Sequence, residues 1–157
     1  MNEPLLWQIR QYVYHYFAEA THPPDVIDTA DLFGMPVEEA GEYYVELNNR
    51  HQFFLEPETL NVQMAWPFSA IPTDFKVHAN GKSYYANCAW DMLGIPAALH
   101  TDAVIEAKFT ESNELVKLEV KNGKVMISRS EAKWTNEELL VHFPLSFSQW
   151  YDDLVFT

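Results

Sequence analysis

Residues 84–99 of the chain read YYANCAWDMLGIPAAL, and the rest of the sequence is organised around this stretch. It holds the one cysteine of the sequence, Cys88, and three positions later comes Asp91, in otherwise apolar surroundings. If a helix starts at Cys88, Asp91 lies one turn further along the same face, because residues three or four apart are neighbours on a helix surface. A thiol and a carboxyl pointing into one apolar space indicate chemistry rather than a plain core.

The composition predicts a folded protein made of one ordinary domain, or of two small lobes that share a core. Of the 157 residues, 48% are hydrophobic and 15% aromatic, which excludes a disordered chain. No apolar run approaches the ~20 residues needed to cross a bilayer. The start, Met1-Asn2-Glu3-Pro4, lacks the basic residues and apolar core of a signal peptide. Together with the lone cysteine, this predicts a reducing cytoplasmic location.

The charge argues against nucleic acid as a partner. The net charge is −13, from 23 acidic and 10 basic residues, and Lys and Arg form no cluster. Binding nucleic acid normally requires a basic face. We therefore expect neither nucleic acid nor a membrane as a partner, and we interpret the acidity as a source of solubility.

The first part of the chain predicts three helices followed by a β-ribbon, which is the outline of a winged helix. Apolar residues at helical spacing, prolines at first turns and Gly34 as a stop place the helices at residues 4–20, 25–33 and 36–49. Short strand-like runs follow at residues 52–55 and 61–66.

The third of these helices would be the DNA reader of a winged helix, and its charge is wrong for that role. A reading helix needs cations for phosphates. Instead, it carries four acidic residues against the terminal Arg50: Glu38, Glu39, Glu42 and Glu46. We therefore predict a winged-helix shape that does not bind DNA, with a repressor kept as a third hypothesis.

The second part predicts a small sheet that carries the Cys88 helix. Residues 67–72 form a plausible connector, and Asn80-Gly81 and Asn122-Gly123 are strong hairpin signals. The expected fold class is α+β, with a helical lobe at residues 1–68 and a mixed-sheet lobe at residues 69–157. The expected strands are residues 74–78, 83–86, 103–110, 115–120 and 124–128, then 139–143 and 154–156 around a short helix at 148–152.

Two readings of Cys88 stay open on the residues alone. A lone cysteine is usually core filler, because free cysteine is among the most buried residue types. However, a helix start lowers the pKa of a thiol, and an apolar pocket raises the pKa of a carboxyl, which would keep Asp91 protonated. A reactive thiolate beside a proton-donating acid is a coherent pair.

The six histidines show no metal-site spacing, and no cofactor-binding motif is present. His142 lies in the apolar run of residues 139–143, which favours a satisfied core histidine over a ligand or base. A papain-like pairing of Cys88 with His142 or His100 has no local support and stays open. We predict no cofactor.

Residues 85–99 closely resemble the active-site segment of the alkylmercury lyases, also called organomercurial lyases. The family's pattern is Cys-Ala-x-Asp-x-Leu followed by a Pro-Ala pair. The residues that match it are Cys88, Ala89, Asp91, Leu93, Pro96 and Ala97. The resemblance extends to the family's winged-helix-like N-terminal domain and to the Val-His-Phe run at residues 141–143 with Trp150 beyond it. It implies a three-helix lobe followed by a small mixed-sheet domain.

The resemblance implies protonolysis of a carbon–mercury bond. Cys88 matches the thiolate that binds the metal, and Asp91 matches the aspartate that mediates proton transfer. The family's second cysteine falls, in a rough alignment, at Glu138, and a carboxylate is a poor substitute for thiolate on a soft metal. The chain is thus expected to be a divergent member of the family, in which external thiols remove the mercury(II) product. Trp90, Glu138 and His142 are the expected substrate-binding residues.

The resemblance favours an enzyme, and two alternatives accompany it. One is an enzyme of the same fold that uses Cys88 and Asp91 on a different, non-mercury small molecule. The other is a non-catalytic relative that keeps the pocket for a ligand or a metal.

Overall fold

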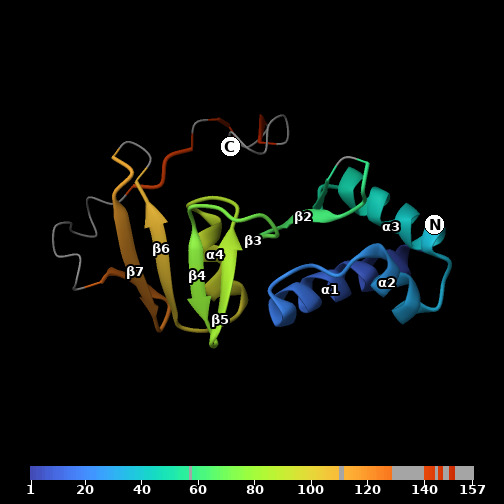
Figure 1. The fold of residues 1–157 in the computed structure, drawn as a ribbon, viewed down its shortest axis with the longest axis horizontal. Coiled ribbons are helices and arrows are strands. Elements are labelled where there is room, and N and C mark those ends of the chain that lie inside the picture. Colours follow the sequence, from blue (N-terminus) through green and yellow to red (C-terminus); the bar gives the residue numbers. More distant parts are fainter. Residues whose placement is uncertain (57, 110–111, 129–139, 144, 147–148, 151–157) are drawn as a thin grey trace.

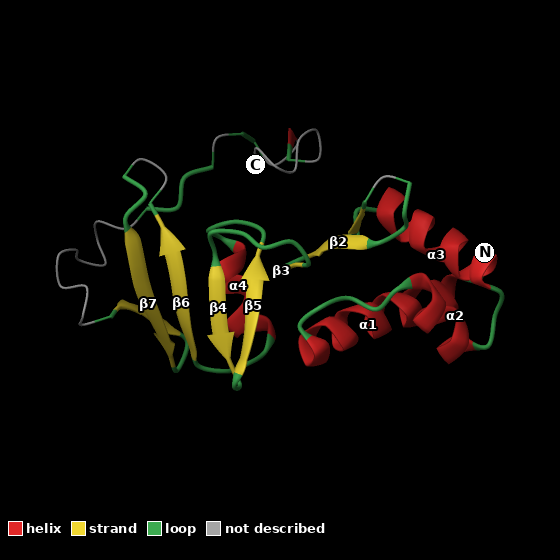
Figure 2. Cartoon of the chain, in the orientation of Figure 1, coloured by secondary structure: helices red, strands yellow, loops and turns green. Residues whose placement is uncertain are grey.

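The structure is a computed structural model, and it describes residues 1–56, 58–109, 112–128, 140–143, 145–146 and 149–150. The molecule is elongated, with three helices at one end and most of a β-sheet at the other (Figure 1). A fourth helix lies against the sheet behind two of its strands (Figure 2). The N-terminus lies at the helical end.

The three predicted helices are present as α1 (Glu3–Ala20), α2 (Val26–Phe33) and α3 (Val37–Asn49). Local sequence explains their starts. The side chain of Asn2 accepts a hydrogen bond from the backbone of Leu5 at the start of α1. Asp25 and Asp28 form a reciprocal capping box at the start of α2.

The helical lobe has its own apolar core. One face of α1 is fully buried at helical spacing, and it packs beside α3 and the residues that follow it. The largest of these side chains are Leu6, Ile9, Val13 and Phe17 of α1, Tyr44 and Leu47 of α3, and Phe53. The buried hydroxyl groups of Tyr44 and Thr29 hydrogen-bond to each other at 2.7 Å, and the Thr29 hydroxyl also donates to the carbonyl of Asp25 at 3.1 Å.

The sheet has eight strands in the order β1-β2-β3-β5-β4-β6-β7-β8, and each pair is antiparallel. The strands are β1 (Phe54–Leu55), β2 (Val62–Ala65), β3 (Phe68–Ser69), β4 (Lys76–Ala79), β5 (Lys82–Ala86), β6 (Ala103–Lys108), β7 (Leu115–Lys121) and β8 (Lys124–Ile127). The α+β class is confirmed. The sheet was predicted to be mixed, whereas every described strand pair is antiparallel.

Helix α4 (Asp91–Ala98) packs against β4 and β5 of this sheet. The register aligns Val77, Ile105 and Leu118 across β4, β6 and β7, and all three side chains are buried. The strands alternate buried and less buried positions, as expected for a sheet with one covered face. This face anchors the helix that follows Cys88.

The sheet also joins the two predicted lobes. β3 occupies residues 68 and 69 and pairs with Ala86 and Tyr85 of β5. The ring of Phe68 stacks on Phe17 of α1 with centroids 5.2 Å apart, and it lies 5.4 Å from Tyr84. The Tyr84 hydroxyl donates a 2.7 Å hydrogen bond to the carbonyl oxygen of Ala18. A domain boundary between residues 68 and 69 stays a prediction, and the hydrogen-bonded sheet runs across that point.

Two expected elements differ, and two others fall wholly or mostly on residues that the structure does not describe. The connector at residues 67–72 contains β3, because Phe68 and Ser69 find partners in β2 and β5. Residues 140–143 form no strand, and Leu140 is 88% exposed. Residues 139 and 154–156 and most of 148–152 lie outside the described part of the chain.

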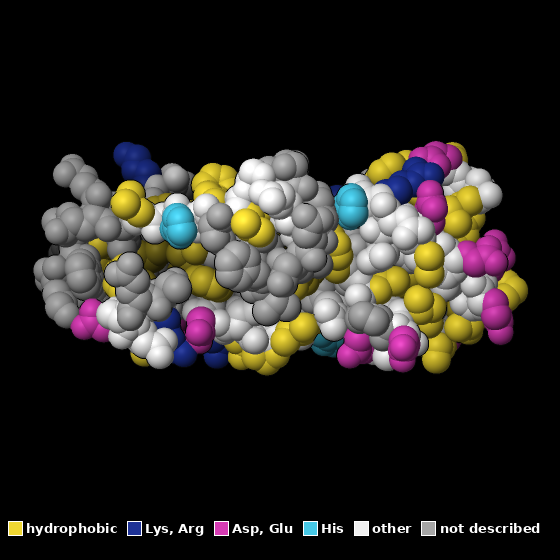
Figure 3. All heavy atoms as spheres, turned by 90° about the horizontal axis from the view of Figure 1, so that it is seen from above, with side chains coloured by type: hydrophobic (Ala, Val, Ile, Leu, Met, Phe, Trp, Pro, Cys, Tyr) yellow, Lys and Arg dark blue, Asp and Glu magenta, His cyan; other side chains and the backbone are white. Residues whose placement is uncertain are grey.

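The charge is unevenly divided along the chain. Residues 1–68 hold 11 acidic and 2 basic residues, for a net charge of −9, whereas residues 69–157 hold 12 and 8, for −4. Acidic side chains gather over the helical end in Figure 3. None of the described helices is both long and apolar enough to span a membrane.

Candidate active site

The candidate site is a turn between β5 and α4. β5 ends at Ala86, and α4 begins at Asp91, so the helix starts three residues later than Cys88. The carbonyl of Cys88 nevertheless accepts a hydrogen bond of 3.1 Å from the backbone of Met92, with helical i to i+4 spacing. The turn therefore winds like a first helical turn, which brings Cys88 and Asp91 to the same side.

Close packing holds α4 in place. A Cβ atom at Gly94 would lie 3.1 Å from Cβ of Pro67, which is tighter than ordinary contact. A glycine at this position therefore lets the helix approach the loop between β2 and β3. Ile95 and Pro96 on the same helix are buried. The site is thus fixed between the sheet and the loop that leads out of the helical lobe.

Two donors converge on one oxygen of Asp91. The Cys88 thiol donates to Oδ2 of Asp91, with sulfur and oxygen 3.6 Å apart. The side-chain amide of Asn87 donates to the same oxygen at 3.3 Å. All three residues are only partly exposed. The predicted thiol–carboxyl pair is therefore formed, and Asn87, whose role the sequence analysis missed, completes it.

Asn87 also has a buried atom without a partner. Its Oδ1 is buried and accepts no hydrogen bond within the described part of the chain. An unsatisfied buried acceptor costs about 1–3 kcal/mol. The amide is held in this orientation by its bond to Asp91, and a bound molecule with a donor group would satisfy the free oxygen.

Burial dominates the electrostatics of both reactive groups. Burial raises the pKa of Asp91 from its ordinary 3.8 to about 6, although the hydrogen bonds from Asn87 and Cys88 lower it. The predicted direction for Asp91 is confirmed. With a pKa near 6, most Asp91 side chains are ionised at pH 7, so the expectation of a mainly protonated acid is wrong.

The pKa of Cys88 is raised, which is opposite to the predicted direction. Burial is the main cause, and the charge of Asp91 adds to it. Hydrogen bonds from the backbone of Asp91 and Trp90 lower the pKa of the thiol, but they do not outweigh burial. The helix start therefore does lower the pKa of the thiol, but by less than burial raises it. In the free protein Cys88 is a thiol that points at a carboxylate.

An aromatic group flanks the turn on its solvent side. Trp90 is 57% exposed, and its ring meets the ring of Phe143 edge-on at 6.1 Å. Phe143 in turn stacks on Trp150 at 5.3 Å. This contact places Phe143 beside Trp90, two residues after Cys88, which no local sequence signal indicated.

The other two predicted substrate-binding residues, His142 and Glu138, are not placed at the site by the described part of the structure. His142 is exposed, so the expectation of a core histidine is wrong; the run around it is not packed into the core. Glu138 lies outside the described residues. Neither His100 nor His142 hydrogen-bonds to Cys88 in the described part of the chain, which leaves the papain-like pairing without support there.

The charge of Asp91 is also felt in the helical lobe, at Tyr14. The pKa of Tyr14 on α1 is raised first by burial, and the charge of Asp91 raises it further. Its hydroxyl donates to the carbonyl of Gln52, and the guanidinium of Arg10 lies 4.3 Å from the centre of its ring. Arg10 also donates to the side chain of Gln52 at 2.8 Å. A tyrosine 74 positions earlier than Cys88 is thus within the electrostatic range of Asp91.

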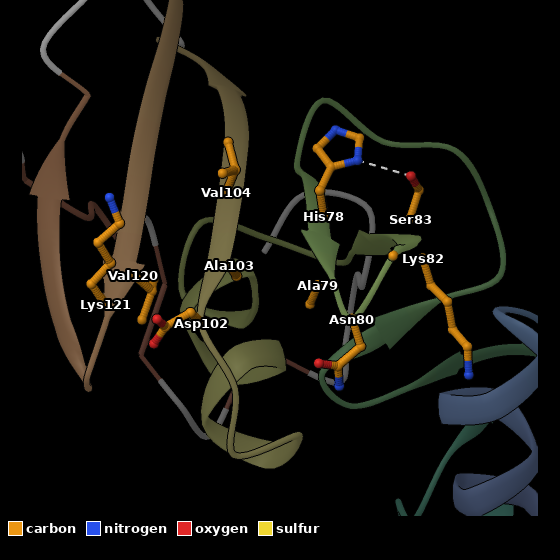
Figure 4. A pocket seen from close by; sticks show the side chains of 11 residues that line it. His78, Ala79, Asn80, Lys82, Ser83, Asp102, Ala103, Val104, Val120 and Lys121 are labelled. Carbon is orange, nitrogen blue, oxygen red and sulfur yellow. Dashed lines mark hydrogen bonds between the residues drawn. The ribbon is translucent and has the colours of Figure 1, made fainter.

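A hollow of about 410 Å³ lies elsewhere, at one end of the sheet beside the turn of the β4–β5 hairpin, and neither Cys88 nor Asp91 lines it. Figure 4 shows His78 and Ser83 on its wall, joined by a 2.8 Å hydrogen bond. Across the described residues, no group of three or more His, Cys, Asp or Glu side chains is placed to hold a metal ion.

A family model matches the chain, and a solved structure shares its fold. The sequence profile named MerB, alkylmercury lyase, matches residues 68–155. A solved structure described as the mercury-bound form of MerB2 superposes with a TM-score of 0.62 at 19% identity. The match covers 83% of this chain and 61% of that one, so the present chain spans less than two thirds of its length. None of the curated proteins compared matches the sequence.

Proposed function

Because the chain belongs to the alkylmercury lyase family, we propose that it cleaves the carbon–mercury bond of an organomercurial by protonolysis. Cys88 is the thiolate that captures the metal, and Asp91 carries the proton to the leaving carbon. The observation that carries this proposal is the contact of 3.6 Å between the Cys88 thiol and the Asp91 carboxylate in a half-buried setting.

The first step is capture. An organomercury thiolate, R–Hg–SR′, exchanges its ligand for the sulfur of Cys88, and the soft metal favours thiolate over oxygen ligands. The thiol must lose its proton to bind, and the carboxylate it already contacts accepts it. R′S⁻ leaves. This step yields R–Hg–S–Cys88 beside a protonated Asp91, and no external base is required.

The second step is proton delivery. Protonated Asp91 donates its proton to carbon while the carbon–mercury bond breaks, and R–H leaves with the electrons of that bond. Mercury(II) stays on Cys88, next to the carboxylate that has formed again. A pKa of about 6 suits both roles, since the acid must take up a proton and release it near neutral pH.

Release of the metal then requires a stronger ligand set. Cys88 is the one cysteine in the 157 residues, and a carboxylate such as Glu138 binds soft metals poorly. External thiols therefore take mercury(II) away as a dithiolate and return a proton to Cys88. The exposed ring of Trp90 offers an apolar surface for the organic group, and His142 directly precedes Phe143, whose ring contacts Trp90.

The test is a protonolysis assay with phenylmercury in excess small-molecule thiol. Benzene release is measured for the wild type and for C88A and D91N, with D31N as a control that removes an exposed carboxylate from α2. We expect release by the wild type and D31N and none by C88A or D91N. Mercury retained on Cys88 without benzene would favour the non-catalytic relative. A lack of Cys88-dependent binding would favour a non-mercury substrate on the same fold.

A further inference from the structure

The outer side of α3 forms a groove that the mercury chemistry does not use. A hollow of about 650 Å³ lies between α3 and Leu60, and most of its lining is apolar. We call it the α3 groove. Val37 and Val45 line it and are 41% and 43% exposed, although both are large apolar residues. An exposed apolar surface of this kind is typical of an interaction site.

Two parallel rows of side chains run along the groove. Val37, Gly41 and Val45 are spaced four residues apart and form an apolar row, since such residues share a helix face. Glu38 and Glu42 repeat at the same spacing one position further on and form an acidic row beside it. The α3 groove thus has an apolar floor and one negatively charged rim.

Gly41 shapes the floor. A Cβ atom at this position would lie 3.1 Å from Cδ1 of Leu60, so the absence of a side chain lets Leu60 approach the helix. Leu60 comes from the loop before β2 and has a positive φ of 59°. The groove therefore depends on a close contact between α3 and this loop.

The acidic rim is not neutralised from within the described part of the chain. Glu38 and Glu42 are exposed and make no ion pair with any described residue, whereas the next acid, Glu46, is paired with Arg50 at 2.7 Å. The surrounding lobe, residues 1–68, carries a net charge of −9. An occupant of the groove must therefore be apolar on one face and basic beside it.

We propose that the α3 groove binds a basic amphipathic helix of a partner protein. Such a helix would place apolar residues on the valine row and Lys or Arg opposite Glu38 and Glu42. Residues four apart lie ~6 Å apart along any α-helix, so the two sets of charges match in spacing. Helices seated by one apolar face in a groove are a recurrent recognition mode.

The partner is a different protein rather than a second copy. A second copy would have to offer a basic helix, and the described helices α1–α4 contain one Lys or Arg, Arg10 of α1. Arg10 is already engaged with Tyr14 and Gln52. Nucleic acid is excluded by the same acidic rim, because phosphates would face Glu38 and Glu42.

The test uses a fluorescent, capped helical peptide of roughly 15 residues, with Leu at every fourth position and Lys directly after each Leu. The fluorescence anisotropy of the peptide is measured while the full chain is added at low salt. We expect E38Q/E42Q to weaken binding about five- to tenfold, the effect of losing two exposed charge pairs. V45S should weaken it as well. The matched control is E39Q/D31N, which removes the same charge from exposed acids that do not line the groove.

The outcomes are distinct. Weaker binding in E38Q/E42Q and V45S, with the control pair within about twofold of the wild type, supports the proposal. Equal weakening in the control pair would mean attraction to the acidic lobe as a whole and would overturn it. An absence of peptide binding, or self-association of the chain that E38Q/E42Q abolishes, would overturn it too. Circular dichroism checks that each variant keeps its helices.

Discussion

Replacing Asp91 by Asn is expected to stabilise the protein above pH 6 while it abolishes proton delivery. Asp91 has its carboxyl in a partly buried, apolar turn, and burial raises its pKa from 3.8 to about 6. Asparagine keeps the shape and an acceptor oxygen for Asn87 and Cys88, and it removes the buried charge. The expected gain therefore comes from the charge alone.

The size and sign follow from proton linkage. Each pKa unit corresponds to 1.36 kcal/mol, so a rise from 3.8 to about 6 corresponds to about 3 kcal/mol. Between these two values the folded state holds the proton and the unfolded state has lost it. The contribution of Asp91 to stability therefore falls as the pH rises from about 4 to about 6 and stays low above that. The Asn variant has no such loss.

The measurement is urea unfolding of the wild type, D91N and D31N in reducing buffer at several pH values from 4 to 8. The quantity of interest is the stability difference at each pH, because Glu3, Glu19 and Glu106 titrate in both proteins and cancel. We expect D91N to match the wild type near pH 4 and to exceed it by about 2–3 kcal/mol at pH 7.5. A constant difference across this range, or an equal gain in D31N, would refute the burial of a charged Asp91.

Three further predictions concern packing, and urea unfolding checks each of them. G94V should destabilise by about 1–3 kcal/mol, since its side chain would overlap Pro67 and displace α4; unchanged stability would contradict the close contact. Y44F should cost about 1–2 kcal/mol because the buried Thr29 hydroxyl loses one of its two partners and keeps only the carbonyl of Asp25; unchanged stability would contradict this contact. Y84F should cost about 1 kcal/mol by removing the bond between β5 and α1, and a neutral result would show that this bond does not hold the lobes together.

The parts of the fold that depend on local sequence were predictable. Helical spacing along α1 identified its buried face, and the two Asn-Gly pairs form hairpin turns with positive φ at Asn80, Gly81, Asn122 and Gly123. β3 was not predictable, because it is two residues long and forms through its partners in β2 and β5. A short pairing of this kind leaves no periodic signal.

The candidate site was likewise predictable only where it depends on local sequence. The three-residue spacing of Cys88 and Asp91 was enough to predict their contact, because a first helical turn brings them together whether the helix starts at 88 or at 91. The pKa of Cys88 was predicted in the wrong direction, since spacing shows the helix start and not the burial that outweighs it. Phe143 contacts Trp90 and the charge of Asp91 acts on Tyr14; both residues come from distant segments, which local spacing does not show.

The continuous sheet has a consequence for any shortened form of this protein. A fragment that begins after Ser69 would lose the partner of Tyr85 and Ala86 and leave one side of β5 open. An unpaired strand side is a template for strands of neighbouring molecules, which leads to aggregation. Cys88 follows two residues beyond this exposed strand. We therefore expect the helical lobe and its ribbon, by supplying β3, to keep the Cys88 half of the chain from pairing with neighbouring molecules.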